Sequence, residues 1–366
     1  MKRRNLVATV AFAALTAFAG VQAQAQEKVV NVYNWSDYID ESILADFTKE
    51  TGIKVVYDVF DSNETLETKL LAGGTGYDVV VPTGNFMQRQ IQAGVFQKLD
   101  KSKLPNLSNM WDEVSQRVAV YDPGNEYAID YMWGTTGLGY NVAKAKEILG
   151  SDAAPGWDAI FNPEIAKKFG DCGIYVLDTA EEVIPAALNF LGLDPNSKDT
   201  ADLEKAGELL ASIRPYIRKF HSSEYINALA NGDICLALGW SGDVLQARDR
   251  AAEAGAGVEV NYTIPAGGAL MWFDMMAIPA DAPHVEEAHA FINYIMKPEV
   301  AAKASDYIFY ANGNKASQPL ISKEVFDDPA IYPPADAMAK LYTKLPYDPK
   351  TQRVVTRTWT KVVTGQ

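Results

Sequence analysis

The chain is poor in the residues that enzymes and metal sites commonly use. Its 366 residues include only three histidines and two cysteines. His284 and His289 are five residues apart, so they would face different sides of a helix rather than form a zinc pair. A Gly-x-Ser-x-Gly elbow, a phosphate loop and a dinucleotide fingerprint are also missing. We therefore expect no catalytic residues, no metal and no cofactor.

Basic residues are scarcer than acidic ones. The chain has 33 Lys and Arg against 47 Asp and Glu, a net charge of −14. Nucleic acids and anionic lipids require a basic surface, so neither is an expected partner, whereas cations are attracted. Beyond the N-terminus no apolar run reaches about 18 residues, so we expect no insertion into a membrane.

The N-terminus has the pattern of an export signal. A basic start at Lys2-Arg3-Arg4 precedes an apolar stretch over residues 6–19 and a small-x-small site at residues 23–25. We expect residues 1–25 to be a signal peptide, with the general export route favoured over the twin-arginine route. Its removal takes away three basic residues and no acids, which changes the net charge from −14 to −17.

The two cysteines, Cys172 and Cys235, lie just before or within expected strands. A single pair in an exported chain favours one disulfide. Metal binding is the minor alternative, because the two residues lack the spacing of a metal site. The bridge would close a loop of about 60 residues and contribute about 4 kcal/mol in the chain-entropy description.

The apolar pattern predicts an α/β fold. Expected strands are residues 29–33, 53–59, 77–82, 171–177 and 234–238. Helices alternate with them, including one over residues 64–72 capped by Asn63, so each sheet should be mixed but mostly parallel, with helices on both faces. Extended segments over residues 127–140 and 258–265 should cross between two lobes that enclose a cleft with a hinge.

About 340 residues remain after the signal peptide, which is too many for one core and indicates two domains. We expect the N-terminal lobe to contain residues 26–134 and 260–312. The C-terminal lobe should then contain residues 135–259 and 313–366.

Several expected strands end in an aromatic residue close to an acid. The strand over residues 234–238 leads into Gly239-Trp240-Ser241-Gly242-Asp243, and Trp35-Ser36-Asp37 and Trp272-Phe273-Asp274 follow the same pattern. Open α/β sheets bind ligands beyond the carboxyl ends of their strands. One such pair means little in so acidic a chain, but their recurrence favours a ligand that is cationic and partly apolar.

These strand ends and the returning segments predict one ligand-binding cleft. Its expected members are Trp35, Ser36, Asp37, Thr83, Glu181 or Glu182, Trp240, Asp243, Trp272, Asp274 and Tyr310. Carboxylates gathered in a cleft repel each other, and a polycation would relieve that repulsion. Trp272 and Tyr310 could equally be core residues, and one of the two glutamates is expected to be only a helix N-terminal acid.

Longer motifs then indicate a family. They are residues 33–39 (YNWSDYI), 77–82 (YDVVVP), 131–137 (YMWGTTG), 231–235 (NGDIC), 239–243 (GWSGD), 309–312 (FYAN) and 331–334 (IYPP). With them the chain resembles the periplasmic putrescine/spermidine-binding proteins of bacterial ABC importers. The resemblance implies a two-lobed type II periplasmic binding protein that closes on a polyamine and delivers it to an inner-membrane permease. It also implies a monomer that carries out no chemical reaction.

The resemblance also implies a role for each site residue. Trp35 and Tyr38 would flank the ligand, with Ser36 and Asp37 beside them. Asp274 would bind one terminal ammonium and Asp243 with Trp240 the far end.

Between these two ends, the family pattern places Glu182, rather than Glu181, along the ligand and Tyr310 against its methylenes. Thr83 stands where a serine is usual. Trp272 stands where putrescine binders have Phe and spermidine binders have Trp, which favours spermidine.

Cys172 and Cys235 match the family's disulfide pair. Three alternatives of other classes stay open: an exported hydrolase that pairs carboxylates such as Asp243 and Asp274, a ferric-ion carrier that uses tyrosine oxygens, and a structural or signalling partner without a ligand.

Overall fold

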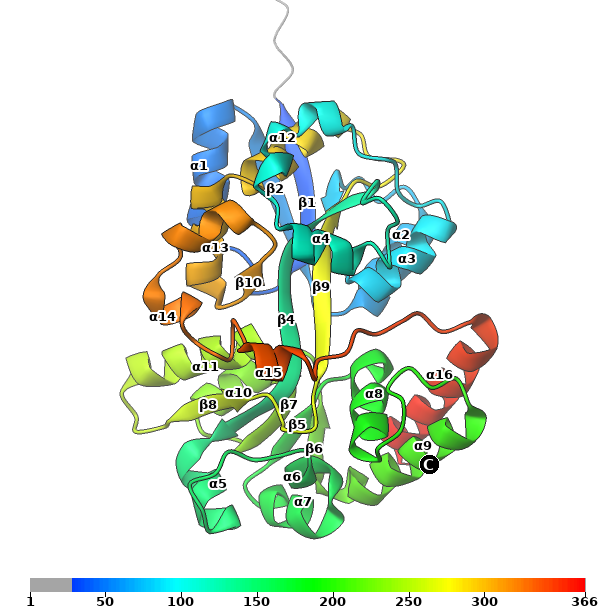
Figure 1. Cartoon of the computed structure of the whole chain (residues 1–366), viewed down its shortest axis with the longest axis vertical. Coiled ribbons are helices and arrows are strands. Elements are labelled where there is room, and N and C mark those ends of the chain that lie inside the picture. Colours follow the sequence, from blue (N-terminus) through cyan, green and yellow to red (C-terminus); the bar gives the residue numbers. More distant parts are fainter. Residues whose placement is uncertain (1–27, 366) are drawn as a thin grey trace, which may run out of the picture.

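Two long paired strands run through the middle of the molecule and join its two lobes (Figure 1). The structure, a computed structural model, describes residues 28–365, so the predicted signal peptide lies outside the described residues. The two strands are β4 (Ala128–Asn141) and β9 (Leu270–Ala277), which pair antiparallel. Every residue of β9 is buried. The strand predicted over residues 127–140 is confirmed as β4.

The first lobe has a parallel trio of strands beside β9. β1 (Val29–Trp35) pairs in parallel with β2 (Lys54–Phe60) and with β3 (Val79–Val80), and β3 pairs antiparallel with β9. The helices around this sheet are α1 (Glu41–Thr51), α2 (Asn63–Ala72), α3 (Gly84–Gln92), α4 (Asp112–Val118), α12 (Val285–Ile295) and α13 (Pro298–Ile308), with the short η1 (Lys101–Lys103) and η2 (Pro105–Asn109).

The second lobe repeats this arrangement on the other side of β4. β5 (Ile174–Val176) pairs in parallel with β6 (Ile217–Phe220) and with β7 (Leu236–Trp240), and β7 pairs antiparallel with β4. Its helices are α5 (Val142–Leu149), α6 (Asp158–Phe161), α7 (Pro163–Gly170), α8 (Ala180–Phe190), α9 (Thr200–Ile213), α10 (Tyr225–Ala230), α11 (Ser241–Ala254) and α16 (Pro349–Thr364), with the short η3 (Arg214–Tyr216). The expected α/β fold with a mixed sheet is confirmed. The strands of residues 28–365 form one continuous sheet with four parallel and five antiparallel strand pairs, so the parallel pairing is confined to the outer strands of each lobe.

The second predicted crossing is wrong in position. Within residues 258–265, β8 (Val260–Thr263) pairs with residues 138–141 of β4 and stays beside the second lobe, whereas β9 is the strand that crosses. Residues 258–265 alternate between apolar and polar side chains, which is typical of a half-buried strand, whereas β9 is apolar at seven of its eight positions and buried throughout. β10 (Ala311–Asn312) pairs with β4 in the first lobe, and the tail continues through η4 (Lys315–Leu320), α14 (Lys323–Phe326) and α15 (Ala335–Met338). The lobe boundaries themselves stay a prediction.

One predicted helix cap is wrong in a way that matters for the cleft. Ser62, not Asn63, caps α2, and its hydroxyl accepts from the Thr65 N–H at 3.2 Å. The Asn63 side chain is therefore free to hold Thr83: its amide nitrogen donates to the Thr83 hydroxyl at 2.8 Å, and its carbonyl accepts from the Thr83 N–H at 3.0 Å. A cap residue and its neighbour look alike in sequence, since both are small and polar.

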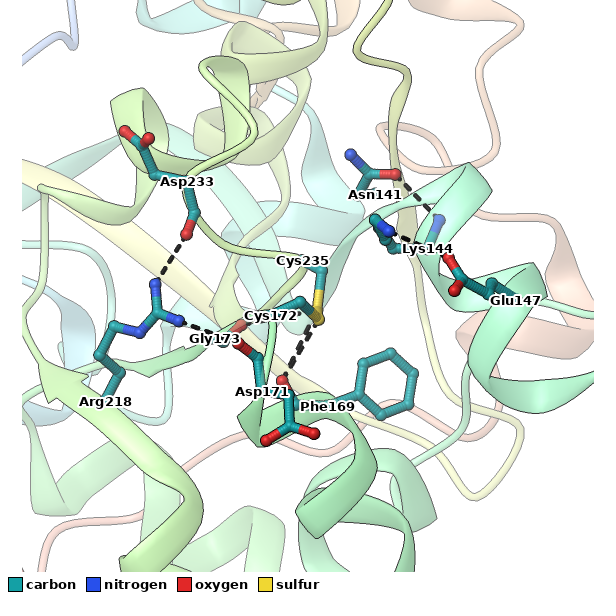
Figure 2. Close-up of a disulfide and its surroundings, with 10 residues drawn as sticks. All are labelled: Asn141, Lys144, Glu147, Phe169, Asp171, Cys172, Gly173, Arg218, Asp233 and Cys235. Atoms are coloured by element: carbon teal, nitrogen blue, oxygen red, sulfur yellow. Dashed lines mark hydrogen bonds and ion pairs between the residues drawn. A yellow bond between two sulfur atoms is a disulfide. The ribbon is translucent and has the colours of Figure 1, made fainter.

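The predicted disulfide between Cys172 and Cys235 is confirmed (Figure 2). Their Cα atoms are 5.7 Å apart, just before β5 and β7. Arg218 also links the two segments that carry the cysteines, because its guanidinium donates to the backbone carbonyls of Asp233 at 2.8 Å and Asp171 at 3.4 Å. Between residues 28 and 365, no helix is both long enough and apolar enough to cross a membrane.

Candidate functional site

A cavity of about 810 Å³, measured together with its open mouth, lies between the lobes where the strand ends meet. β1 ends at Trp35 and β7 at Trp240, and the two indole rings meet edge-on with centroids 5.7 Å apart. Ten of the eleven predicted ligand-binding residues line this cavity: Trp35, Ser36, Tyr38, Thr83, Glu182, Trp240, Asp243, Trp272, Asp274 and Tyr310. Residues far apart in the chain therefore converge at one place, as the strand-end argument expects.

Asp274 on β9 is the acid at the first-lobe side of the cavity. Its two carboxylate oxygens accept from the Thr83 hydroxyl at 2.6 Å and from the Tyr38 hydroxyl at 2.9 Å. Burial raises the pKa of Asp274 to about 7, and these two hydrogen bonds oppose the rise only in part. A hydroxyl on each oxygen fixes the carboxylate in place without neutralising it.

Asp243 is held in the same way by two tyrosines, one on α10 and one just before β10. Its oxygens accept from the hydroxyls of Tyr225 and Tyr310, both at 2.7 Å. Burial raises the pKa of Asp243 to about 6, again against the effect of the two hydroxyls. Asp243 lies in the first turn of α11, where the helix dipole also favours a negative charge.

Glu182 on α8 is the third buried acid. It accepts from the Thr136 hydroxyl of β4 at 2.5 Å. Burial raises the pKa of Glu182 to about 7, and the charges of Asp274 and Glu181 add to the rise. Asp243 acts on the pKa of Asp274 in the same direction. These acids therefore repel one another along the cavity, and no hydrogen bond joins any two of the three within residues 28–365.

Aromatic rings form the walls between the carboxylates. Tyr38 and Tyr310 meet edge-on with centroids 5.2 Å apart, and Trp272 and Tyr310 do so at 5.3 Å. The indole nitrogen of Trp35 donates to the Val81 carbonyl at 2.9 Å, which fixes that ring at the end of β1. Trp272 and Tyr310, which the sequence left equally open as core residues, are buried and also line the cavity.

Asp37 is the one predicted ligand-binding residue that does not line this cavity. Its carboxylate pairs with Arg250 of α11 across the lobes at 2.8 Å, and its carbonyl accepts from the Gln246 amide at 3.2 Å. Both charged side chains are partly exposed, 41% for Asp37 and 36% for Arg250. The contact therefore joins the two lobes away from the cavity lining, and a direct ligand contact by Asp37 stays a prediction.

Several cavity residues escaped the sequence reasoning. They are Glu64, Asn85, Tyr121, Thr179 and Lys344, which line the cavity from α2, α3, a turn, the N-cap of α8 and the tail. Tyr225 and Thr136 were missed as supports of Asp243 and Glu182. Of these residues, only Thr136 could have been found from the sequence, because it belongs to the uncharged segment after Asp130 that was expected to cross the hinge.

The described residues contain no group of three or more His, Cys, Asp or Glu side chains arranged to hold a metal ion. The hydroxyls of Tyr38 and Tyr310 in the cavity, and of Tyr225 behind it, instead donate to Asp274 or Asp243. Three hydrogen-bonded carboxylates between aromatic walls suit a ligand that carries several positive charges along an apolar chain.

Comparison with known proteins gives consistent results. Residues 42–333 match the sequence family described as bacterial extracellular solute-binding protein. The chain is 54% identical over 368 residues to the putrescine-binding periplasmic protein PotF of Escherichia coli (strain K12), covering 100% of this chain and 99% of that protein. It is 53% identical over 349 residues to the putrescine-binding periplasmic protein SpuD of Pseudomonas aeruginosa (strain UCBPP-PA14), covering 95% of each. A solved structure of a putative spermidine/putrescine ABC transporter from Listeria monocytogenes is similar with a TM-score of 0.82 at 33% identity, covering 93% of this chain and 100% of that one.

Proposed function

The chain belongs to the bacterial extracellular solute-binding protein family, and from that premise we propose that its cavity binds a polyamine, either putrescine or spermidine or both. It is a periplasmic protein with the two-lobed type II fold, and it delivers its ligand to an ABC importer. We also propose that it acts as a monomer. The lobes are proposed to divide at residues 134/135, 259/260 and 312/313.

The observation that carries the ligand class is the set of three buried carboxylates, Asp243, Asp274 and Glu182, which accept hydrogen bonds from hydroxyls and have no cation beside them within residues 28–365. Buried charges are expensive unless they are paired. The hydroxyl donors offset only part of the free-energy cost of burying each carboxylate charge, as the raised pKa of each acid indicates. Ammonium groups would supply the missing charge.

Within this proposal each wall of the cavity has a role. Asp274 binds one terminal ammonium and Asp243 the other, while Glu182 lies along the chain. The rings of Trp35, Trp240, Trp272, Tyr38 and Tyr310 cover the methylenes and attract the ammonium groups, at roughly 0.5–2 kcal/mol for each cation–π contact. Ser36 and Thr83 complete the polar edge.

Closure of the lobes supplies the rest of the affinity. The two crossing strands β4 and β9 connect the lobes without a break, so a small change of twist in them can open or close the cleft. On closure Trp35 meets Trp240 and Asp37 meets Arg250, which removes the ligand from water and strengthens each ion pair.

A thermal-shift panel followed by calorimetry tests the proposal. The panel contains putrescine, cadaverine, spermidine, spermine, amino acids and ferric iron. We expect a clear rise in Tm with at least one polyamine and none with amino acids or iron, because a ligand that binds only the folded state stabilises it. Stabilisation by iron alone would indicate a ferric carrier, and the absence of any shift would refute a receptor for these solutes. Turnover of a bound compound would indicate an enzyme.

A further inference from the structure

A buried lysine lies at one end of a cavity that otherwise gathers acids. Lys344 is the only basic residue among the described residues that line it, against six acids: Asp61, Glu64, Glu181, Glu182, Asp243 and Asp274. The Lys344 side chain is only 3% exposed. Lysine is almost never so buried unless it is paired, so its presence in a cation-binding cavity needs an explanation.

Glu181 is the partner of this lysine. The Lys344 ammonium lies 3.6 Å from a Glu181 oxygen and 3.3 Å from the centre of the Tyr347 ring, and it donates to the Leu345 carbonyl. Neither Glu181 oxygen accepts a hydrogen bond in residues 28–365. Arg89 is near at 3.7 Å, but it already makes two hydrogen bonds to Glu67. Glu181 is therefore a buried carboxylate whose charge is balanced by two neighbouring cations, Lys344 and Arg89.

The backbone around Lys344 is fixed firmly. The Lys344 carbonyl accepts from the Tyr121 hydroxyl at 2.9 Å, and the Asn196 side chain bonds the Thr343 carbonyl at 2.9 Å and the Leu345 N–H at 2.7 Å. Two positions earlier, Tyr342 forms a parallel bridge with Leu270 at the start of β9. The ammonium is thus built into the cavity and does not sit on a loose tail.

The six acids that line the cavity differ in their surroundings. Asp61 and Glu64 are exposed, whereas Glu181 is buried and already has Lys344 and Arg89 beside it. The positive charge near Glu181 therefore belongs to the protein. Three buried acids, Asp243, Asp274 and Glu182, remain for the charges of a ligand. Glu181 is adjacent to Glu182 on α8, and its charge adds to the rise in the pKa of Glu182.

Resting on the proposed function, we propose that Lys344 is a selectivity residue. Its ammonium beside Glu181 stands where the third ammonium of a triamine would lie, so the site favours a diamine such as putrescine over spermidine. Repulsion of an unwanted charge is a general way to obtain specificity. This preference for a diamine is opposite to the preference for spermidine that the resemblance implied for Trp272.

A length-matched ligand pair tests this with the unmodified protein. N-butyl-1,4-diaminobutane has the length of spermidine, with a methyl group in place of its third ammonium. By calorimetry we expect the wild-type chain to bind it more tightly than spermidine, and to bind putrescine more tightly than spermidine by about tenfold or more. Spermidine binding equal to or tighter than that of either ligand would overturn the proposal.

Variants then assign the effect to the lysine. Lys344→Met keeps the bulk and removes the charge, and we expect it to raise the affinity for spermidine relative to putrescine by about tenfold. Lys340→Met, an exposed lysine four residues earlier, is the control and should leave the ratio unchanged. Lys344→Met combined with Glu181→Gln should lose most of the gain. An unchanged ratio in Lys344→Met would refute the role, whereas a wild-type chain that binds no polyamine would refute the proposed function itself.

Discussion

Replacing Asp274 by asparagine should change ligand affinity and stability in opposite directions. The substitution keeps the shape of the side chain and one acceptor for Thr83 or Tyr38, but it removes the charge that we assign to a terminal ammonium. Two unit charges 3 Å apart attract by about 5–6 kcal/mol at an effective dielectric constant of 20. Part of this remains through the amide dipole, so we expect a net loss of about 2–4 kcal/mol, or roughly 30- to 1000-fold in Kd.

The ligand-free variant should be more stable than the wild type at pH 7.5. Burial raises the pKa of Asp274 to about 7, above its value in the unfolded chain, so the folded state resists ionisation of this group. The resulting penalty is absent below about pH 4, where the group is neutral in both states, and it grows until about pH 7. Asparagine avoids the penalty, so its Tm should rise by about 1–4 °C.

Calorimetry with putrescine and thermal unfolding without ligand measure the two effects. Asp327→Asn, which removes the charge of an exposed aspartate just after α14, is the matched control and should change neither quantity. An unchanged Kd in Asp274→Asn would rule out the proposed ion pair. A lower Tm would show that the carboxylate stabilises the ligand-free fold, contrary to the reasoning from its burial.

Three further predictions concern pH, the selectivity ring and the disulfide. Burial raises the pKa values of the three cavity acids to about 6 to 7, so these groups are partly protonated near neutral pH. Putrescine should therefore bind at least about tenfold more weakly at pH 5.5 than at pH 7.5, and its binding should release protons near pH 6.5. Calorimetry in buffers of different ionisation enthalpy measures this release, and finding none would contradict the prediction. Trp272→Phe should lower the affinity for spermidine relative to putrescine, and a constant ratio would remove the argument from this ring. The double variant Cys172→Ser/Cys235→Ser should lower the free energy of unfolding by about 3–4 kcal/mol. It should leave the Kd for putrescine within about twofold, because the disulfide lies just before β5 and β7, at the ends of these strands opposite the cleft. A large change in Kd would connect the disulfide to the binding site.

The strand-end residues were predictable because the sheet itself brings them together. Trp35 ends β1, Thr83 follows β3 and Trp240 ends β7, so once the strands are recognised their last residues must face the cleft. Asp274 lies within a strand that crosses the hinge, yet its place among apolar neighbours already set it apart from a solvated acid.

Other parts of the site could not be obtained in this way. Lys344 lies outside the helices and strands, and long-range contacts, among them those of Tyr121 and Asn196, fix its position. Glu181 and Glu182 occupy the same helix turn, and their difference arises from what faces them: Lys344 in one case and Thr136 in the other. Such distinctions depend on tertiary packing that local pattern does not encode.

The ion pair between Asp37 and Arg250 has a consequence for how long cargo is held. It joins the two lobes, but both side chains are more than a third exposed, so dissolved ions screen it. An exposed pair of this kind contributes at most about 1 kcal/mol, which corresponds to a several-fold change in the opening rate. The carboxylates inside are shielded once the lobes meet. Salinity outside the cell should therefore alter the residence time of the cargo much more than the choice of cargo.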